Sequence, residues 1–198
     1  KKETPNGNAA KDSSRYIHIG IFSAIAVILY YFWTVPYRAA LSYREQLQLF
    51  QTTSTYFEEL TARPGGPATY LGEFFTQFFN NFWIGAAVMT GLLISVMLIS
   101  YLICNRFAPS APKSTNLALS IIPLISLMLF LGNPDVTLTF VVALSISLAG
   151  SYLFTSIKAK PTTTVLSYSM MIAGTTLLYW LAGAVTIIFT FLITAYAF

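Results

Sequence analysis

The feature that most constrains this chain is a run of residues, 82–104, that contains no charged side chain. A helix needs about 20 consecutive apolar residues to cross the hydrocarbon core of a bilayer. A soluble domain usually carries about 25% charged residues, whereas this chain is 9% charged and 56% hydrophobic. So few charges cannot cover a water-facing surface. The sequence therefore predicts an all-α, polytopic transmembrane helical bundle.

Apolar blocks of similar length recur along the chain and predict about six spans. The expected spans are residues 17–36, 82–104, 115–132, 136–157, 163–182 and 183–198. The boundary at Gly183 is the weakest, and residues 163–198 could form one bent element. We prefer two spans, because about 35 apolar residues would overshoot the bilayer by more than tilt can absorb.

Both ends of the chain carry further expectations. Residues 1–16 are polar in composition and predict a disordered cytoplasmic tail before a transmembrane domain over 17–198. The chain lacks an initiator Met and stops inside an apolar block. We therefore expect it to be the N-terminal part of a longer protein.

The basic residues indicate an orientation. With the N-terminus cytoplasmic, eight of the eleven Lys and Arg residues fall in cytoplasmic segments, as the positive-inside rule requires. These are Lys1, Lys2, Lys11, Arg15, Arg106, Lys113, Lys158 and Lys160. The spans hold no ionisable residue other than His18, near one interface. Because pumps and ion-coupled transporters place such residues inside the membrane, a transporter is disfavoured.

The opposite side is dominated by one loop, residues 37–81, which holds most of the polar side chains outside the cytoplasm. Pro64, Gly65, Gly66 and Pro67 predict a tight turn, in which the glycines can adopt positive φ. The helix expected after it has a Phe-rich face opposite a polar face, so it should lie in the interface plane. The residues expected to contact lipid are Phe74, Phe75, Phe78, Phe79 and Trp83.

Two interpretations of this loop stay open. In the first, the interfacial helix only braces the second span. In the second, the loop forms a ledge beside a lipid-linked substrate, and Glu45 acts as a general base at the membrane surface. The other polar candidates in the loop are Arg44, Gln46, Glu58, Glu59, Arg63, Glu73 and Gln77. An exposed Glu next to an Arg is more often an ordinary solvated pair.

Several kinds of chemistry lack their sequence signature. No His accompanies the loop carboxylates, so a His-carboxylate metal site is not expected, and no cofactor is implied. There is no Walker loop, no Gly-x-Ser-x-Gly and no paired-cysteine zinc spacing. Basic residues lie in separate loops rather than on one face, so nucleic acid is not an expected partner.

Three segments of the chain resemble a known but uncharacterised family. They are residues 43–50 (YREQLQLF), 63–66 (RPGG) and 70–79 (YLGEFFTQFF), with the turn 132–134 (GNP) fitting the same pattern of short hairpins. The sequence resembles Bacteroidetes multi-pass inner-membrane proteins that are filed as a domain of unknown function. The resemblance implies a bacterial inner membrane and a longer polypeptide, and it implies no activity.

A weaker likeness concerns layout alone. The loop is similar to that of the C-fold glycosyltransferases, which place an acidic residue in the first extracytoplasmic loop beside interfacial helices. Here Glu45 stands where those enzymes usually have Asp. This likeness implies a polyprenyl-linked sugar as substrate, and it rests on architecture rather than on a motif.

Three functions follow, in order of preference. The first is a membrane subunit or scaffold of an envelope complex, with the bilayer and other membrane subunits as partners. The second is an extracytoplasmic glycosyltransferase-like enzyme that acts on a lipid-linked substrate through Glu45. The third is a transporter.

Overall fold

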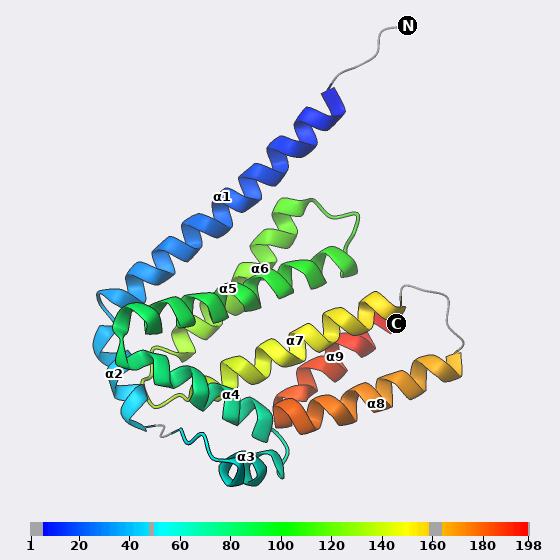
Figure 1. Cartoon of the computed structure of the whole chain (residues 1–198). Helices are drawn as coiled ribbons and strands as arrows, with labels where there is room; N and C mark the ends of the chain where they lie inside the picture. The colour runs from blue at the N-terminus through cyan, green and yellow to red at the C-terminus, as the bar shows by residue number, and fades with distance from the viewer. Residues whose placement is uncertain (1–5, 48–49, 159–163, 198) are drawn as a thin grey trace, which may run out of the picture.

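The computed structural model describes residues 6–47, 50–158 and 164–197, and this part of the chain is all-helical (Figure 1). The predicted all-α class is confirmed there. The elements are α1 (Asn6–Thr34), α2 (Arg38–Leu47), α3 (Ser54–Thr61), α4 (Gly66–Thr76), the 3₁₀ helix η1 (Gln77–Asn80), α5 (Phe82–Phe107), α6 (Lys113–Phe130), α7 (Leu138–Lys158), α8 (Thr164–Ala182), the 3₁₀ helix η2 (Gly183–Val185) and α9 (Thr186–Ala197).

Within the described residues, five stretches of helix are long and apolar enough to cross a membrane, which suggests a membrane protein. They are Tyr16–Thr34, Phe82–Phe107, Lys113–Phe130, Leu138–Ile157 and Tyr168–Tyr196. The fifth stretch contains a turn at η2, after which α9 has 12 residues. Twelve residues rise about 18 Å, less than the ~30 Å hydrocarbon core. The expected count of six spans therefore stays a prediction.

The first helix begins earlier than the sequence suggested. α1 starts at Asn6, inside the segment expected to be a disordered tail. After Gly7, no Gly or Pro interrupts the chain before Gly20, so the backbone can extend the helix of the apolar block toward the N-terminus.

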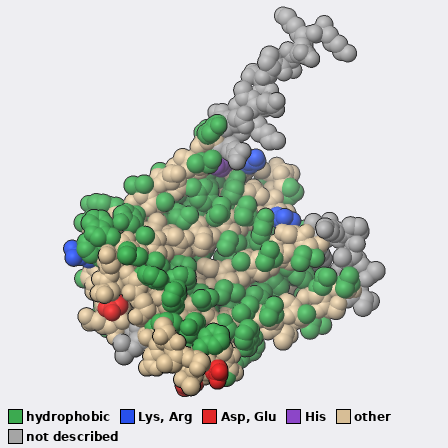
Figure 2. All heavy atoms as spheres, viewed as in Figure 1, with side chains coloured by type: hydrophobic (Ala, Val, Ile, Leu, Met, Phe, Trp, Pro, Cys, Tyr) green, Lys and Arg blue, Asp and Glu red, His purple; other side chains and the backbone are tan. Residues whose placement is uncertain are grey.

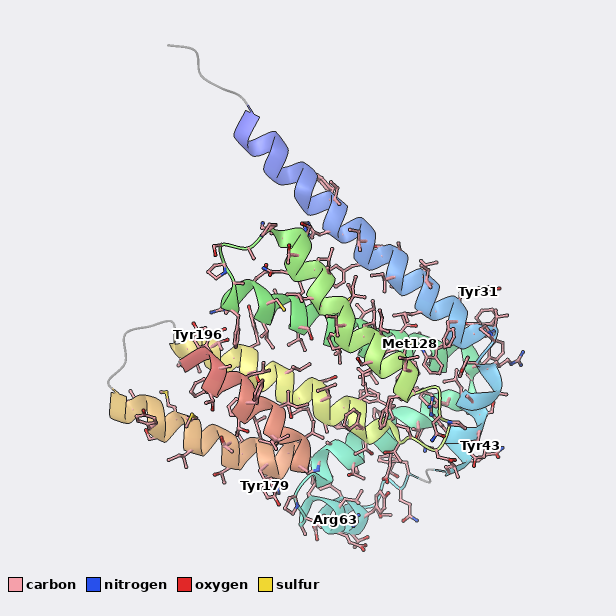
Figure 3. The ribbon with its side chains drawn as sticks, turned by 180° about the vertical axis from the view of Figure 1, so that it is seen from behind. Tyr31, Tyr43, Arg63, Met128, Tyr179 and Tyr196 are labelled. Carbon is pink, nitrogen blue, oxygen red and sulfur yellow. The ribbon has the colours of Figure 1, made fainter. Side chains whose placement is uncertain are left out.

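The long helices run back and forth, so that the turns among the described residues lie at two ends of the bundle (Figure 1). The turn between α6 and α7 and the turn at η2 lie at the same end as α2, α3 and α4. In Figure 3, Tyr31 and Tyr43 lie toward this end, whereas Tyr196 lies at the opposite one. The ring of Tyr196 is 5.3 Å from that of Phe107, at the end of α5.

The core lies where α5 packs between α1, α6 and α7. Its fully buried side chains include Met89, Leu93 and Met97 on α5 and Leu138 and Val141 of α7. Hydrophobic side chains cover much of the outer face in Figure 2, and acidic side chains gather at the end that carries α3. An apolar core under an apolar surface is typical of helices held together by van der Waals packing within lipid.

Pro123 interrupts the hydrogen bonding inside α6 without breaking the helix. Its nitrogen has no hydrogen to donate to the carbonyl one turn earlier. The nearby Ser120 donates its hydroxyl to the carbonyl of Leu117, at 2.7 Å.

Two glycines join the α3–α4 turn to the α8–α9 turn. Gly65 has φ 80°, as expected for this turn, and Gly183 has φ 63°. A Cβ on Gly65 would lie 3.2 Å from the Cα of Gly183. Two hydrogen bonds of 2.9 Å reinforce the contact, from Gly65 N–H to the carbonyl of Trp180 and from Trp180 Nε1 to the carbonyl of Thr61. Both the backbone conformation and the close approach require glycine.

We expect Gly65→Ala and Gly183→Ala each to lower the free energy of unfolding by about 1–3 kcal/mol, because an L side chain is strained in the left-handed region. Thermal unfolding of the detergent-solubilised chain measures the change. Gly91→Ala is the matched control, because a Cβ there meets nothing within 4 Å. Equal stability of all three variants would contradict the junction.

Candidate functional site

The helices α2, α3, α4 and η1 form a cap over one end of the bundle (Figure 1). We use the word cap for the described residues between Arg38 and Asn80. Aromatic rings hold its parts together: the ring of Phe50 is 5.0 Å from Tyr70 and 5.6 Å from Phe74. Phe57 also packs edge-on against Tyr70, at 5.0 Å. Edge-to-face pairs at these distances contribute about 0.5–1.5 kcal/mol each beyond area burial.

Arg44 fixes α2 to the turn between α6 and α7. Its Nη2 donates hydrogen bonds to the main-chain carbonyls of Leu131, at 2.6 Å, and Asn133, at 2.9 Å. Leu131 ends α6, where a helix leaves its C=O groups unpaired and carries partial negative charge. The carbonyl of Asn133 lies in the following turn and also accepts from the N–H of Val136, at 3.3 Å. Beside Arg44, Tyr43 donates its hydroxyl to Asp135 Oδ1 in the same α6–α7 turn, at 3.3 Å.

The guanidinium of Arg44 is buried, with 2% of the residue exposed. Its Cζ lies 5.6 Å from the centre of the Trp33 ring. Burial lowers the pKa of Arg44 below its ordinary value, and the neighbouring Tyr37 partly opposes that shift. Nε and Nη1 have no hydrogen-bond partner, and neither does the buried Nε1 of Trp33.

This position differs from the solvated Arg44–Glu45 pair considered from the sequence. Consecutive residues of an α-helix point about 100° apart, so Arg44 faces the bundle while Glu45 stays half-buried at the side of α2. Arg44 therefore connects the cap to the bundle.

We expect Arg44→Gln to lower the free energy of unfolding by about 2–3 kcal/mol, because hydrogen bonds made by a charged donor to α6 are lost. Tyr43→Phe should cost less than about 0.5 kcal/mol, since its bond to Asp135 is exposed. Thermal unfolding of the two variants side by side checks the difference. Equal losses would mean that the buried guanidinium is not the main attachment.

A second polar contact lies inside the cap. The hydroxyl of Tyr56, on α3, donates to Oε2 of Glu73, on α4. Burial, followed by this hydrogen bond, raises the pKa of Tyr56 to about 12. Because Tyr56 binds its proton more tightly in the folded chain than in the unfolded one, folding stability should be full below pH 10 and fall as the pH rises toward 12.

We expect the unfolding temperature of the wild type to fall more steeply than that of Tyr56→Phe between pH 10 and pH 12. The variant lacks the phenol, which ionises at a lower pH in the unfolded chain than in the folded chain. Unfolding scans at half-unit pH steps measure the two slopes, with Tyr179→Phe, an exposed tyrosine on α8, as the control. Parallel curves for wild type and Tyr56→Phe would rule out the linkage.

The remaining polar candidates are spread over the cap. Glu45 and Gln46 lie on α2, Glu58 and Glu59 on α3, Arg63 between α3 and α4, and Gln77 at the start of η1. Of these, Glu45 is half-buried and the other five are exposed. Among the described residues, no three His, Cys, Asp or Glu side chains come together as a group that could hold a metal ion.

The five residues expected to contact lipid divide into two sets. Phe74, Phe78 and Trp83 are exposed, by 40%, 37% and 53%. Phe75 is half-buried against the core, and Phe79 is fully buried. Phe79 lies in the 3₁₀ helix η1, which begins at Gln77 and turns 120° per residue, so the phase of the Phe-rich face changes before it. Phe75 precedes this change, on α4.

Two cavities among the described residues lie outside the cap. One, of about 570 Å³, runs between α5, α6, α7 and α9 and is apolar apart from groups such as Ser100, Cys104 and Ser126. The other, of about 420 Å³, lies at the α8–α9 turn and is lined by threonines, among them Thr186, whose buried hydroxyl has no partner. Both volumes suit small ligands. Neither cavity is lined by a glutamate of the cap.

These features were beyond sequence reasoning for different reasons. The cavities depend on packing between helices distant in the chain, for which one sequence holds no signal. The burial of Arg44 had an indirect signal, because the turn 132–134 leaves helix-end carbonyls that need a donor. The pair of Tyr56 and Glu73 crosses a turn whose geometry the sequence did not specify.

Comparison with known proteins adds one match. A model of a family of unknown function (DUF6057) matches residues 14–198. No curated protein and no solved structure matches the chain. The match agrees with the resemblance to an uncharacterised family, and it brings no source organism, substrate or glycosyltransferase relative.

Proposed function

The chain belongs to this family of unknown function (DUF6057), and we propose that it serves as a membrane-embedded subunit or scaffold of a larger complex. The proposal extends to a bacterial inner membrane with a cytoplasmic N-terminus. It is supported by the eight basic residues that the positive-inside rule assigns to cytoplasmic segments of the sequence. Of these, Arg106 lies at the end of α5 and Lys113 at the start of α6, away from the cap (Figure 1).

The proposal rests mainly on how little of α1 is buried. Only 17% of its membrane-spanning window is buried, against 44% for α7. Its inner side packs on α5, where Phe22 meets Tyr101 at 6.0 Å and Tyr30 meets Trp83 at 6.4 Å. The exposed residues of this window are left to contact a neighbouring chain.

The outer side of α1 has the composition of a helix-packing surface. Gly20 and Ala24 are exposed one turn apart, and a Cβ on Gly20 would meet nothing within 4 Å. Val27, Ile28 and Tyr31 continue the exposed side toward the cap. Small residues spaced by four let two membrane helices approach closely. We propose that a helix of another membrane subunit packs here.

The arrangement of the cap favours a subunit over an enzyme. Its glutamates lie on three separate helices, and Glu73 already accepts a hydrogen bond from Tyr56. General acid–base chemistry needs a carboxylate within hydrogen-bond reach of a bound substrate. The glycosyltransferase-like alternative, with Glu45 as base and Phe74 and Phe78 against the lipid, stays the second candidate.

We expect the full chain, extracted in mild detergent from its native membrane, to co-purify with other membrane proteins at fixed stoichiometry. Gly20→Leu combined with Ala24→Leu should release them, because bulky side chains block close helix packing. Ala173→Leu, on the exposed side of α8, is the matched control and should leave the assembly intact.

Light scattering of the purified particle and mass spectrometry of its contents measure the outcome. A chain of 21.9 kDa that runs alone in its micelle would contradict the subunit proposal. Transfer of sugar from a polyprenyl carrier that is lost in Glu45→Gln would establish the enzyme instead.

A further inference from the structure

The larger of the two cavities, of about 570 Å³, lies between helices that are all long and apolar enough to belong to membrane-crossing stretches. α5 and α7 pack on each other, α6 packs on α5, and α9 packs on α7. Figure 3 shows α6 and α9 on the same side of the α5–α7 pair, and the cavity lies between them. We call this cavity the groove.

The groove has a buried floor and an exposed edge. Its floor includes Leu144 and Leu148 of α7, which are 8% and 7% exposed. Its edge on α6 includes Leu119, Ser126 and Phe130, and all three are exposed. An exposed edge on a membrane-crossing helix faces the hydrocarbon of the bilayer. The molecules that reach the groove from the side are therefore lipids.

Aromatic rings bound the groove at both ends. At the end of the cap, the rings of Phe130 and Phe140 lie 5.0 Å apart, joining the last residue of α6 to the start of α7. At the opposite end, Phe107 of α5 and Tyr196 of α9 lie 5.3 Å apart. The way into the groove is therefore lateral, between α6 and α9.

We infer that the groove binds one acyl chain of a membrane phospholipid, a site that goes beyond the proposed role in an assembly. On α6 the groove extends from Leu119 to Phe130, a rise of about 16 Å. One leaflet provides about half of the ~30 Å hydrocarbon core, so a single acyl chain has about this length. The lining offers little to a polar ligand: Ser126 already donates its hydroxyl to the carbonyl of Ile122, at 3.0 Å.

Two other occupants fit the groove less well. A helix is about 10 Å across, so a 16 Å piece of another subunit's helix fills about 1,300 Å³, more than twice the volume of the groove. The chain of a polyprenyl carrier is much longer than one leaflet is thick and would extend past the ring pairs at the ends. An acyl chain supplies the van der Waals contacts that α6 lacks on this side. Binding should therefore stabilise the position of α6, which among the described spanning helices packs extensively on α5 alone.

The first test is retention of lipid by the full chain. Purified in mild detergent and released in a native mass spectrometer, the wild type should keep one phospholipid. Ser126→Trp places an indole in the groove and should lower the retained fraction at least tenfold. Ile125→Trp is the matched control, because Ile125 is the neighbouring residue, is exposed and does not line the groove. It should keep the lipid as the wild type does.

The second test is stabilisation by added lipid. Dioleoyl phosphatidylcholine, whose headgroup carries no net charge, is returned to the delipidated chain, so that a response reports the acyl chains. We expect the unfolding temperature to rise saturably, by about 3–6 °C at tenfold the Kd, in the wild type and in Ile125→Trp. In Ser126→Trp it should not change.

A measurement on the wild type alone covers the case in which Ser126→Trp does not fold. A phosphatidylcholine with a photoactivatable diazirine in the middle of one acyl chain should crosslink to residues 119–130 and 188–192. The exposed Ile172 and Leu177 of α8, outside the groove, should react far less.

Any of four results would overturn the inference. They are the absence of a retained phospholipid, retention that is equal in Ser126→Trp and Ile125→Trp, a retained polyprenyl carrier in place of a phospholipid, and crosslinks spread evenly over the lipid-facing helices.

Discussion

The cap depends on a guanidinium that is buried under the end of a helix. Arg44 donates to the carbonyls of Leu131 and Asn133, which lie 87 and 89 positions further along the chain. The carbonyl of Leu131, at the end of α6, is one that the helix leaves unpaired, so this contact satisfies a helix-end acceptor and part of the guanidinium. Breaking a buried charged contact of this kind is strongly destabilising. The Arg44 contact sets the position of α2, and α2 in turn sets where the chain continues into the rest of the cap.

A second attachment works without charge. At Gly65 and Gly183, two turns approach so closely that a side chain on either would collide with the other backbone. The Trp180 indole then donates to the carbonyl of Thr61, at 2.9 Å. One attachment holds the start of the cap to α6 and α7, and the other holds its middle to α8 and α9. The cap therefore joins helix ends that are far apart in sequence.

The sequence predicted the properties that depend on composition and short range. Uncharged blocks such as 82–104 indicated helices able to cross a membrane, and Pro64 to Pro67 indicated the turn where Gly65 has positive φ. The sequence did not predict properties that depend on how helices pack against each other. Arg44 was expected beside Glu45 in water, because one sequence does not say which side of a short helix is covered.

The same limit applies to the Phe-rich helix. Its apolar face was extrapolated at α-helical spacing, and the tightening at Gln77 moved Phe79 from that face into the core, against Gly85. Phe74, on α4, and Phe78, in η1, remain exposed. The errors in the candidate site thus come from tertiary contacts that override a local pattern.

Crosslinking in native membranes can measure whether α2 is fixed to the turn between α6 and α7. In a Cys104→Ser background, Tyr43→Cys and Asp135→Cys should react rapidly with a short thiol crosslinker. The pair Tyr43→Cys and Lys113→Cys, which joins α2 to the opposite end of α6, should not react. Adding Arg44→Gln should slow the first reaction. Crosslinking of positions 43 and 135 that is no faster than that of 43 and 113 would contradict the account.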